Sequence, residues 1–250
     1  MATTAALSSG VTAPTLGKES RRIFVRQASV DDLDALLEIG LAAMPQDPQW
    51  DYRFPYRHQF PNDTRLHTRE RYREFLENRS GNWFVSLAEH YSNSPYAKPV
   101  PVAFAIWNVS NVTNPQAPSH SKAQANVLDI SNKNILNQRR DANKAHMMAW
   151  KATMKASKAN LFDAPYGASH FQLQILATDP AFQRRGAAAA LCRDGIQLAH
   201  RLGMKITVFA SPMGQKLYST LGFRSVSTII VRADAEEEFI HVEAMVYSYA

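Results

Sequence analysis

Cysteine and long apolar runs are what this chain most clearly lacks. Its 250 residues contain one cysteine, Cys192, so an internal disulfide is excluded and a reducing compartment is favoured. No run approaches the roughly 18–20 apolar residues that a membrane-spanning helix requires. We therefore expect a cytoplasmic protein with no membrane partner, and leave a nuclear location open.

The usual glycine loops for nucleotides are also missing. Neither the Rossmann spacing of three glycines nor the Gly-Lys-Ser/Thr ending of a P-loop is present. The histidines have no metal-ligand spacing, since His58 and His67 are too far apart for one helix face, and so we expect no metal. No base lies near Cys192 in the sequence to support a covalent acyl-cysteine route, and we interpret it as a small apolar residue of a helix.

The composition is that of one globular domain. Hydrophobic residues make up 45% of the chain, enough for a single core, and the formal net charge is +6. The positive charge is scattered, so it is compatible with an anionic partner without indicating one. Residues 1–20 are rich in Ala, Ser, Thr and Gly and lack the features of a secretory signal. They are predicted to be a disordered tail ahead of one domain at 21–250.

Strands and helices are predicted along most of 23–249. The segment Met44–Asp63 has four prolines and five aromatic residues, and is predicted as a loop whose rings are covered by the domain body or by a ligand. An inserted loop–helix segment is expected at about 110–165, opening with a polar loop at Ser110–Asn126. The predicted strands are Ile23–Gln27, Trp83–Glu89, Val100–Val109, Phe171–Thr178, Lys205–Ser211, Arg224–Ala233 and Ile240–Tyr249; the predicted helices follow Asp31 as far as Leu41 and span Thr64–Asn78, roughly Asn132–Ala159, the residues after Gln183–Ala188, and Gln215–Leu221.

The helix predicted at Asn132–Ala159 leaves two interpretations open. Met147, Trp150 and Met154 mark one face, and a neighbouring stripe is basic. This pattern is typical of a core-facing stripe with a solvated flank. The alternative is a nucleic-acid or membrane element, but no recognised nucleic-acid motif accompanies the charge, so we expect no nucleic-acid partner. The lysines of the stripe are Lys144, Lys151, Lys155 and Lys158.

A strand, a turn and a helix centred on Gly186 carry the clearest chemical signal. The strand-like run Phe171–Thr178 is stopped by an Asp-Pro pair, and Gln183–Ala188 (QRRGAA) opens a helix. A helix start has unpaired backbone N–H groups and the positive end of the helix dipole, so it can bind a diphosphate that reaches the backbone. The glycine and two alanines leave that approach open, and two arginines add positive charge. Taken alone, the pattern also fits an ordinary capped helix.

Two motifs together resemble the GNAT superfamily of N-acetyltransferases. The family pattern Gln/Arg-x-x-Gly-x-Gly/Ala is matched at every defined position by Gln183–Ala188. Downstream, Ala210–Phe223 (ASPMGQKLYSTLGF) is similar to the family's next motif, in which a Tyr lies four residues before the Gly of a Leu-Gly-Phe ending. The resemblance covers most of Ile23–Tyr249 and is specific at Phe171–Phe223. The residues of both motifs look most like those of fungal members of the superfamily.

The resemblance implies a fold and a cofactor site. The fold is a mixed α/β domain with a strongly twisted, mostly antiparallel central sheet of six or seven strands and helices on both faces. Acetyl-CoA would enter where two central strands part, with its diphosphate on the amides of the glycine turn and its pantetheine arm along the preceding strand. The matching cofactor-binding residues are Leu176, Ala177, Thr178, Gln183, Arg184, Arg185, Gly186, Ala187 and Ala188, with Ser211 where the family often has an Asn.

The resemblance also implies catalytic groups. The family's Tyr in the next helix often protonates the departing thiolate, which makes Tyr218 the expected general acid. The family often draws a base from the strand before the turn, but the matching position holds Gln172, which cannot take a proton. His170 lies on the same strand face and titrates in the useful range, so it is the candidate base, directly or through water, with a structural role as the alternative. Glu89 is a weaker candidate.

The expected activity is acetyl transfer from acetyl-CoA to a primary amine, of a small molecule or of a protein, by direct attack on the thioester. The alternative, raised by Gln172, is a CoA-binding member of the family that catalyses no transfer and serves as a sensor or interaction module. We expect the acceptor to bind at the aromatic segment Trp50–Phe60 and at the insert Ser110–Pro165, because the cofactor side is accounted for elsewhere.

Overall fold

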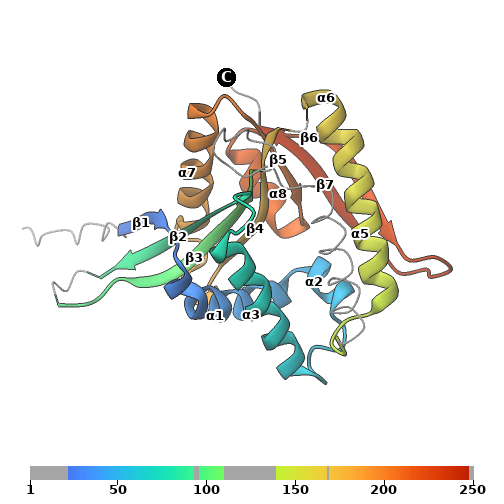
Figure 1. Cartoon of the computed structure of the whole chain (residues 1–250), viewed down its shortest axis with the longest axis horizontal. Helices are drawn as coiled ribbons and strands as arrows, with labels where there is room; N and C mark the ends of the chain where they lie inside the picture. Colours follow the sequence, from blue (N-terminus) through green and yellow to red (C-terminus); the bar gives the residue numbers. More distant parts are fainter. Residues whose placement is uncertain (1–21, 93–95, 110–138, 168, 248–250) are drawn as a thin grey trace, which may run out of the picture.

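The computed structural model describes residues 22–92, 96–109, 139–167 and 169–247 (Figure 1). The predicted tail at 1–20 and the predicted loop Ser110–Asn126 lie outside these residues, as does the first part of the helix predicted from Asn132. Among the described helices, none is both long and apolar enough to cross a membrane.

Seven strands form one sheet in the order β1-β2-β3-β4-β5-β7-β6. Every neighbouring pair is antiparallel except β4 and β5, which run parallel. The expected mixed α/β fold with a mostly antiparallel sheet of six or seven strands is confirmed. The strands are β1 Arg22–Gln27, β2 Trp83–Tyr91, β3 Val100–Asn108, β4 His170–Thr178, β5 Lys205–Ala210, β6 Phe223–Arg232 and β7 Phe239–Tyr247.

Helices cover both faces of the sheet (Figure 1). Alternate residues of β3 separate the two faces: Phe104 packs in a cluster with α1 and α3, whereas Trp107 packs in a cluster with α7 and α8. On the face that α1 and α3 cover, α2 and α5 pack against β6 and β7 through a third cluster around Val242. The helices are α1 Leu33–Ala43, α2 Pro48–Arg53, α3 Pro61–Glu77, α5 Lys144–Lys158, α6 Ala164–Tyr166, α7 Ala187–Arg201 and α8 Pro212–Thr220, with 3-10 turns η1 Val30–Asp32, η2 Met44–Gln46 and η4 Pro180–Phe182 and a π-helical turn η3 Ala159–Asp163.

The segment Met44–Asp63 is not the uniform loop that its prolines predicted. Asp47 caps α2, because its carboxylate accepts a hydrogen bond from the Gln49 amide at 2.9 Å. The following proline occupies the first turn of the helix, where no backbone donor is needed. Tyr52 and Phe54 are buried in the domain body, so the body rather than a ligand covers these two rings.

The basic helix begins and ends later than predicted. Asn143 caps α5, because its side-chain oxygen accepts hydrogen bonds from the backbone amides of Ala145 and His146. The π-helical turn η3 then continues the helix to Asp163. Trp150 and Met154 pack in the third cluster, as the core-facing interpretation predicts, whereas Met147 is not part of it. Lys151 is exposed, as are two other lysines of the stripe.

A close contact fixes α7 on the sheet. Residue 195 is glycine, and a Cβ there would lie 2.2 Å from the indole ring of Trp107. The helix backbone therefore rests directly on β3, and the loop at the start of α7 is held at a defined place above the sheet.

Candidate active site

The parallel strands β4 and β5 part halfway along their length. Their pairing runs from His170↔Lys205 to Leu173↔Val208 and stops there. β4 continues to Thr178 paired with β3, while β5 continues to Ala210 paired with β7. The inner edge of each strand beyond this point is free of the other, as the resemblance implies for the pantetheine site. We call the opening between Gln174–Thr178 of β4 and Phe209–Ala210 of β5 the parting.

A bulge in β4 lies at the parting. The register with β3 skips Gln174, since Trp107 pairs with Leu173 and Ile106 pairs with Ile175. Leu173 packs in the α7 cluster before the bulge, and Leu176 packs against the same cluster after it. A bulge bends a strand and changes which side chains face each side, so β4 turns away from β5 here without losing β3.

The loop after β4 has the open backbone that an anion site requires. Arg184 and Gly186 both have positive φ, 59° and 91°, and α7 begins at Ala187. Within the described part of the chain, the amides of Arg184 through Ala188 have no hydrogen-bond acceptor. A Cβ added at Gly186 would meet no atom of the described residues within 4 Å. Five unpaired donors thus surround open space at the positive end of the α7 dipole.

The charge at this loop is also uncompensated. Arg184 and Arg185 are exposed, and no ion pair joins either to a carboxylate of the described residues. The Arg185 guanidinium lies 5.0 Å from the ring centroid of Phe182, which leaves its N–H groups available in the plane. Gln183, the first residue of the motif, reaches back with its side-chain amide to the Thr178 carbonyl at 3.5 Å and to Gln46 at 3.2 Å. The loop can therefore bind a diphosphate with backbone and side chains together.

Tyr218 lies on α8, buried on the face that α7 also covers. A Cβ at Gly214, one turn earlier, would lie 2.6 Å from the Tyr218 ring, so the glycine allows the ring to lie against its own helix. Burial raises the pKa of Tyr218 well above its usual value, and the nearby Cys192 and Asp47 act in the same direction. The phenol is therefore protonated at neutral pH and can donate a proton.

His170 is held at the paired end of β4. Its Nε2 lies 2.8 Å from the Asp163 carboxylate, and its Nδ1 lies 2.9 Å from the hydroxyl of Thr207. A neutral imidazole fits both contacts, with Nε2–H donating and Nδ1 accepting. Burial lowers the pKa of His170, and the hydrogen bond to Asp163 only partly opposes this. Because both ring nitrogens have partners, a substrate proton can reach His170 through Thr207 but not by direct contact.

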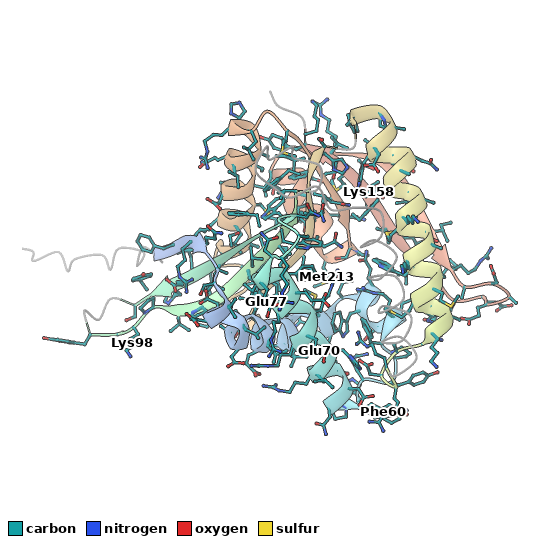
Figure 2. All side chains as sticks on the ribbon, in the orientation of Figure 1. Phe60, Glu70, Glu77, Lys98, Lys158 and Met213 are labelled. Carbon is teal, nitrogen blue, oxygen red and sulfur yellow. The ribbon has the colours of Figure 1, made fainter. Side chains whose placement is uncertain are left out.

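Asp163 and Lys158 complete this group. Lys158 lies near the end of α5 (Figure 2), and its ammonium is 2.6 Å from the Asp163 carboxylate that His170 also contacts. Burial acts to raise the pKa of Asp163, but the hydrogen bonds from Lys158 and His170 outweigh it and hold the pKa below its usual value. The π-helical turn brings Asp163 to this position, which sequence periodicity did not predict.

The remaining candidates lie at different distances from the parting. Glu89 is buried on β2 and pairs with Arg26 of β1 at 2.8 Å, two strands away from the parting. Burial raises the pKa of the Cys192 thiol to about 12, which agrees with its interpretation as an apolar residue. Ser211 is the N-cap of α8 at the end of β5, next to the parting. Among the described residues, no group of three or more side chains is arranged to hold a metal ion.

Residues that the sequence did not single out close the other side of the parting. Gln49 of α2 reaches the Ala210 carbonyl of β5 at 3.5 Å, and Asp47 is close enough to Tyr218 to influence its pKa. The Asp-Pro pair at 47–48 was the available signal, because it marks a helix start inside the supposed loop. Two surface hollows, of about 300 and 530 Å³, lie elsewhere, beside Tyr247 and beside the β6–β7 turn at Glu236.

Comparison with known proteins agrees with this geometry. Residues 116–236 match a family model described as "Acetyltransferase (GNAT) domain". No curated protein sequence matches the chain. Among solved structures, it is similar to a polyamine N-acetyltransferase from Drosophila melanogaster that catalyses the formation of N-acetylagmatine (16% identity, TM-score 0.59, 91% of this chain and 100% of that chain covered). It is also similar to arylalkylamine N-acetyltransferase 2 from Aedes aegypti (15% identity, TM-score 0.56, 90% and 97% covered).

A third similar structure, the PaiA N-acetyltransferase from Thermoplasma acidophilum, was solved in complex with coenzyme A (11% identity, TM-score 0.50, 91% and 99% covered). These likenesses show a GNAT-like fold, and the match of residues 116–236 to the GNAT domain model supports N-acetyltransferase activity. They lend no support to a specifically fungal resemblance.

Proposed function

We propose that this chain transfers the acetyl group of acetyl-CoA to a primary amine by direct attack of the amine on the thioester. The observation that carries the proposal is the set of unpaired amides from Arg184 to Ala188 at the start of α7. A diphosphate bound there aims the rest of CoA at the parting, since Thr178 ends β4 immediately before the turn that leads into this loop.

The reaction needs few side chains. The amine nitrogen forms a bond to the thioester carbonyl carbon while the carbon–sulfur bond breaks. Backbone groups of Leu176, Ala177 and Thr178 polarise the carbonyl oxygen, so no metal is required. The leaving thiolate takes its proton from Tyr218, whose raised pKa keeps the phenol in the protonated form that can donate.

The amine must also lose a proton, because it arrives as an ammonium. We place His170 in this role through the hydroxyl of Thr207, which donates to Nδ1 and can accept from a water on its other side. The proton then rests on an imidazole whose Nε2–H is held by Asp163. The amine thus becomes neutral before attack. It loses its second proton as the amide forms, and this proton restores the Tyr218 phenol that donated to the thiolate, so CoA leaves as the thiol.

The test is release of the CoA thiol from acetyl-CoA in the presence of primary amines. Tyr218→Phe is expected to lower turnover by about a hundredfold or more, because the thiolate then leaves without a proton donor. The same change should leave the dissociation constant of acetyl-CoA unaltered, since the phenol is not part of the diphosphate site.

Tyr72→Phe is the matched control. Tyr72 is also buried, its hydroxyl has no hydrogen-bond partner among the described residues, and burial raises its pKa too. Removal of the Tyr72 hydroxyl should leave turnover unchanged. Equal turnover in Tyr218→Phe and the unaltered protein would remove Tyr218 from the mechanism. Binding of acetyl-CoA without thiol release for any amine would favour the non-catalytic sensor instead.

A further inference from the structure

Arg53, at the end of α2, has a guanidinium group surrounded by aromatic rings. Its carbon Cζ lies 4.4 Å from the ring centroid of Trp150 on α5, 5.3 Å from that of Phe54 and 5.8 Å from that of Trp50. Rings stacked on the faces of a guanidinium leave its N–H groups pointing outward in the plane. The rings thus fix the plane of the guanidinium group without accepting hydrogen bonds from it.

Most of those donors are unpaired. Nε donates to the Gln49 carbonyl at 2.9 Å, but the two terminal nitrogens have no acceptor among the described residues. Burial lowers the pKa of Arg53 to about 10, so the group stays charged at neutral pH. The side chain is partly exposed, which leaves a route for a ligand.

The arginines around Arg53 differ from it in having carboxylate partners. Arg57 pairs with Asp51 at 2.5 Å, and Arg139 pairs with the fully buried Asp141 at 2.7 Å. Arg140 also pairs with a carboxylate on α3. The charge of Asp47 partly opposes the lowering of the Arg53 pKa, but no carboxylate of the described residues forms an ion pair with Arg53. A guanidinium that is crowded by rings and unpaired is costly to keep, unless a ligand supplies the missing charge.

Arg53 is close to the reaction centre along α2. Asp47 caps the start of this helix and influences the pKa of both Tyr218 and Arg53. Gln49 then touches β5 at the parting, and Arg53 follows one turn later. Six residues separate Asp47 from Arg53, which corresponds to about 9 Å along a helix axis. One molecule of modest length can reach both ends.

We propose that Arg53 binds a carboxylate of the acceptor, so that the acceptor is an aminocarboxylate with its amine and its carboxylate at opposite ends. The proposal rests on the acetyl-transfer function and names the substrate class for it. The amine lies toward Asp47 and Tyr218, and the carboxylate forms paired hydrogen bonds with the terminal nitrogens of Arg53. A diamine of the same length would place its second ammonium beside the guanidinium and be repelled.

The first experiment needs no variant. Acetyl transfer is measured with 6-aminohexanoate, hexylamine and 1,6-diaminohexane, which share a chain and differ in the group at the far end. A charge-assisted pair predicts that kcat/KM for 6-aminohexanoate exceeds that for hexylamine by about ten- to a hundredfold, with the diamine lowest. Preference for the diamine, or no preference, overturns the proposal.

The second experiment assigns the preference to Arg53. In Arg53→Met the ratio of kcat/KM for 6-aminohexanoate to that for hexylamine should fall to about one, through KM. The matched control is Arg140→Met: Arg140 also lies over a ring, that of Phe60 at 4.8 Å, but it is paired with Asp63 and exposed. The control should keep the ratio of the unaltered protein. An unchanged ratio in Arg53→Met overturns the proposal.

A binding measurement separates this inference from the catalytic one. The protein saturated with CoA is titrated with 6-aminohexanoate in a calorimeter, so no turnover is needed. Binding that is lost in Arg53→Met supports the carboxylate site even if no amine is acetylated, in which case the proposed transfer fails alone. Acetylation of hexylamine together with no binding of 6-aminohexanoate sinks the carboxylate site and leaves the transfer standing.

Discussion

The two halves of β4 differ in what they contribute. In the first half, His170–Leu173, every side chain is buried, and the backbone pairs with β5 throughout and with β3 at Gln172 and Leu173. In the second half, Gln174–Thr178, side chains are mostly more exposed and the backbone pairs with β3 alone. One strand therefore provides stability through its side chains at one end and a free backbone edge at the other, with the bulge at Gln174 dividing them.

The largest expected difference between the halves is in stability. Phe171 is fully buried between Trp107 and the helices of its face, so Phe171→Ala should lower the free energy of unfolding by about 3–5 kcal/mol. Gln174 is exposed, and Gln174→Ala should change it by less than about 0.5 kcal/mol. Urea unfolding followed by fluorescence measures both. Similar losses of unfolding free energy in the two variants would mean that side chains of Gln174–Thr178 also contribute to packing.

Sequence patterns predicted most of this arrangement for physical reasons. The first amides of a helix have no partner within the helix, so the open backbone at Gly186 was predictable from residue types, whereas its assignment to a diphosphate came from the resemblance of the motifs. The parting was not predictable in this way, because the residue pattern of a strand does not tell whether the strand remains paired with its neighbour. It was implied only by the resemblance of the motifs.

The acceptor side was harder to predict. The four prolines of Met44–Asp63 led to the prediction of a loop where α2 lies, although Asp47 and the proline after it mark the first turn of that helix. The partners of His170 come from a π-helical turn and from β5, and neither spacing has a signature in sequence. Arg53 is the same residue type as its neighbours Arg57 and Arg139, and only the structure shows that it forms no ion pair with a carboxylate of the described residues.

A smaller effect concerns the buried histidine of the first half. Because burial lowers the pKa of His170 in the folded protein, the unfolded chain takes up a proton below about pH 6.5 that the folded protein resists. The stability contributed by neutral His170 is complete above that pH and is lost progressively as the pH falls toward the folded-state value. Urea midpoints between pH 8 and pH 5 should therefore fall, and His170→Gln should reduce the slope.

The control for this effect is the exposed His241 of β7. His241→Gln should keep the slope of the unaltered protein. Asp163 does not interfere, because its lowered pKa keeps it ionised over this range. A slope that survives in His170→Gln would place the pH dependence elsewhere and weaken the interpretation of His170 as a neutral imidazole.

The central claim is that unpaired amides at the start of α7 bind the diphosphate of acetyl-CoA, and the two glycines that flank α7 test it directly. Gly186 and Gly203 both have positive φ, 91° and 65°, and a Cβ at either would meet no atom of the described residues within 4 Å. Glutamate therefore introduces comparable backbone strain at both ends of the helix, but only at Gly186 does its carboxylate occupy the anion site. In calorimetry, acetyl-CoA should bind Gly203→Glu as it binds the unaltered protein and should not bind Gly186→Glu; undiminished binding to Gly186→Glu, or an equal loss in both, would contradict the account.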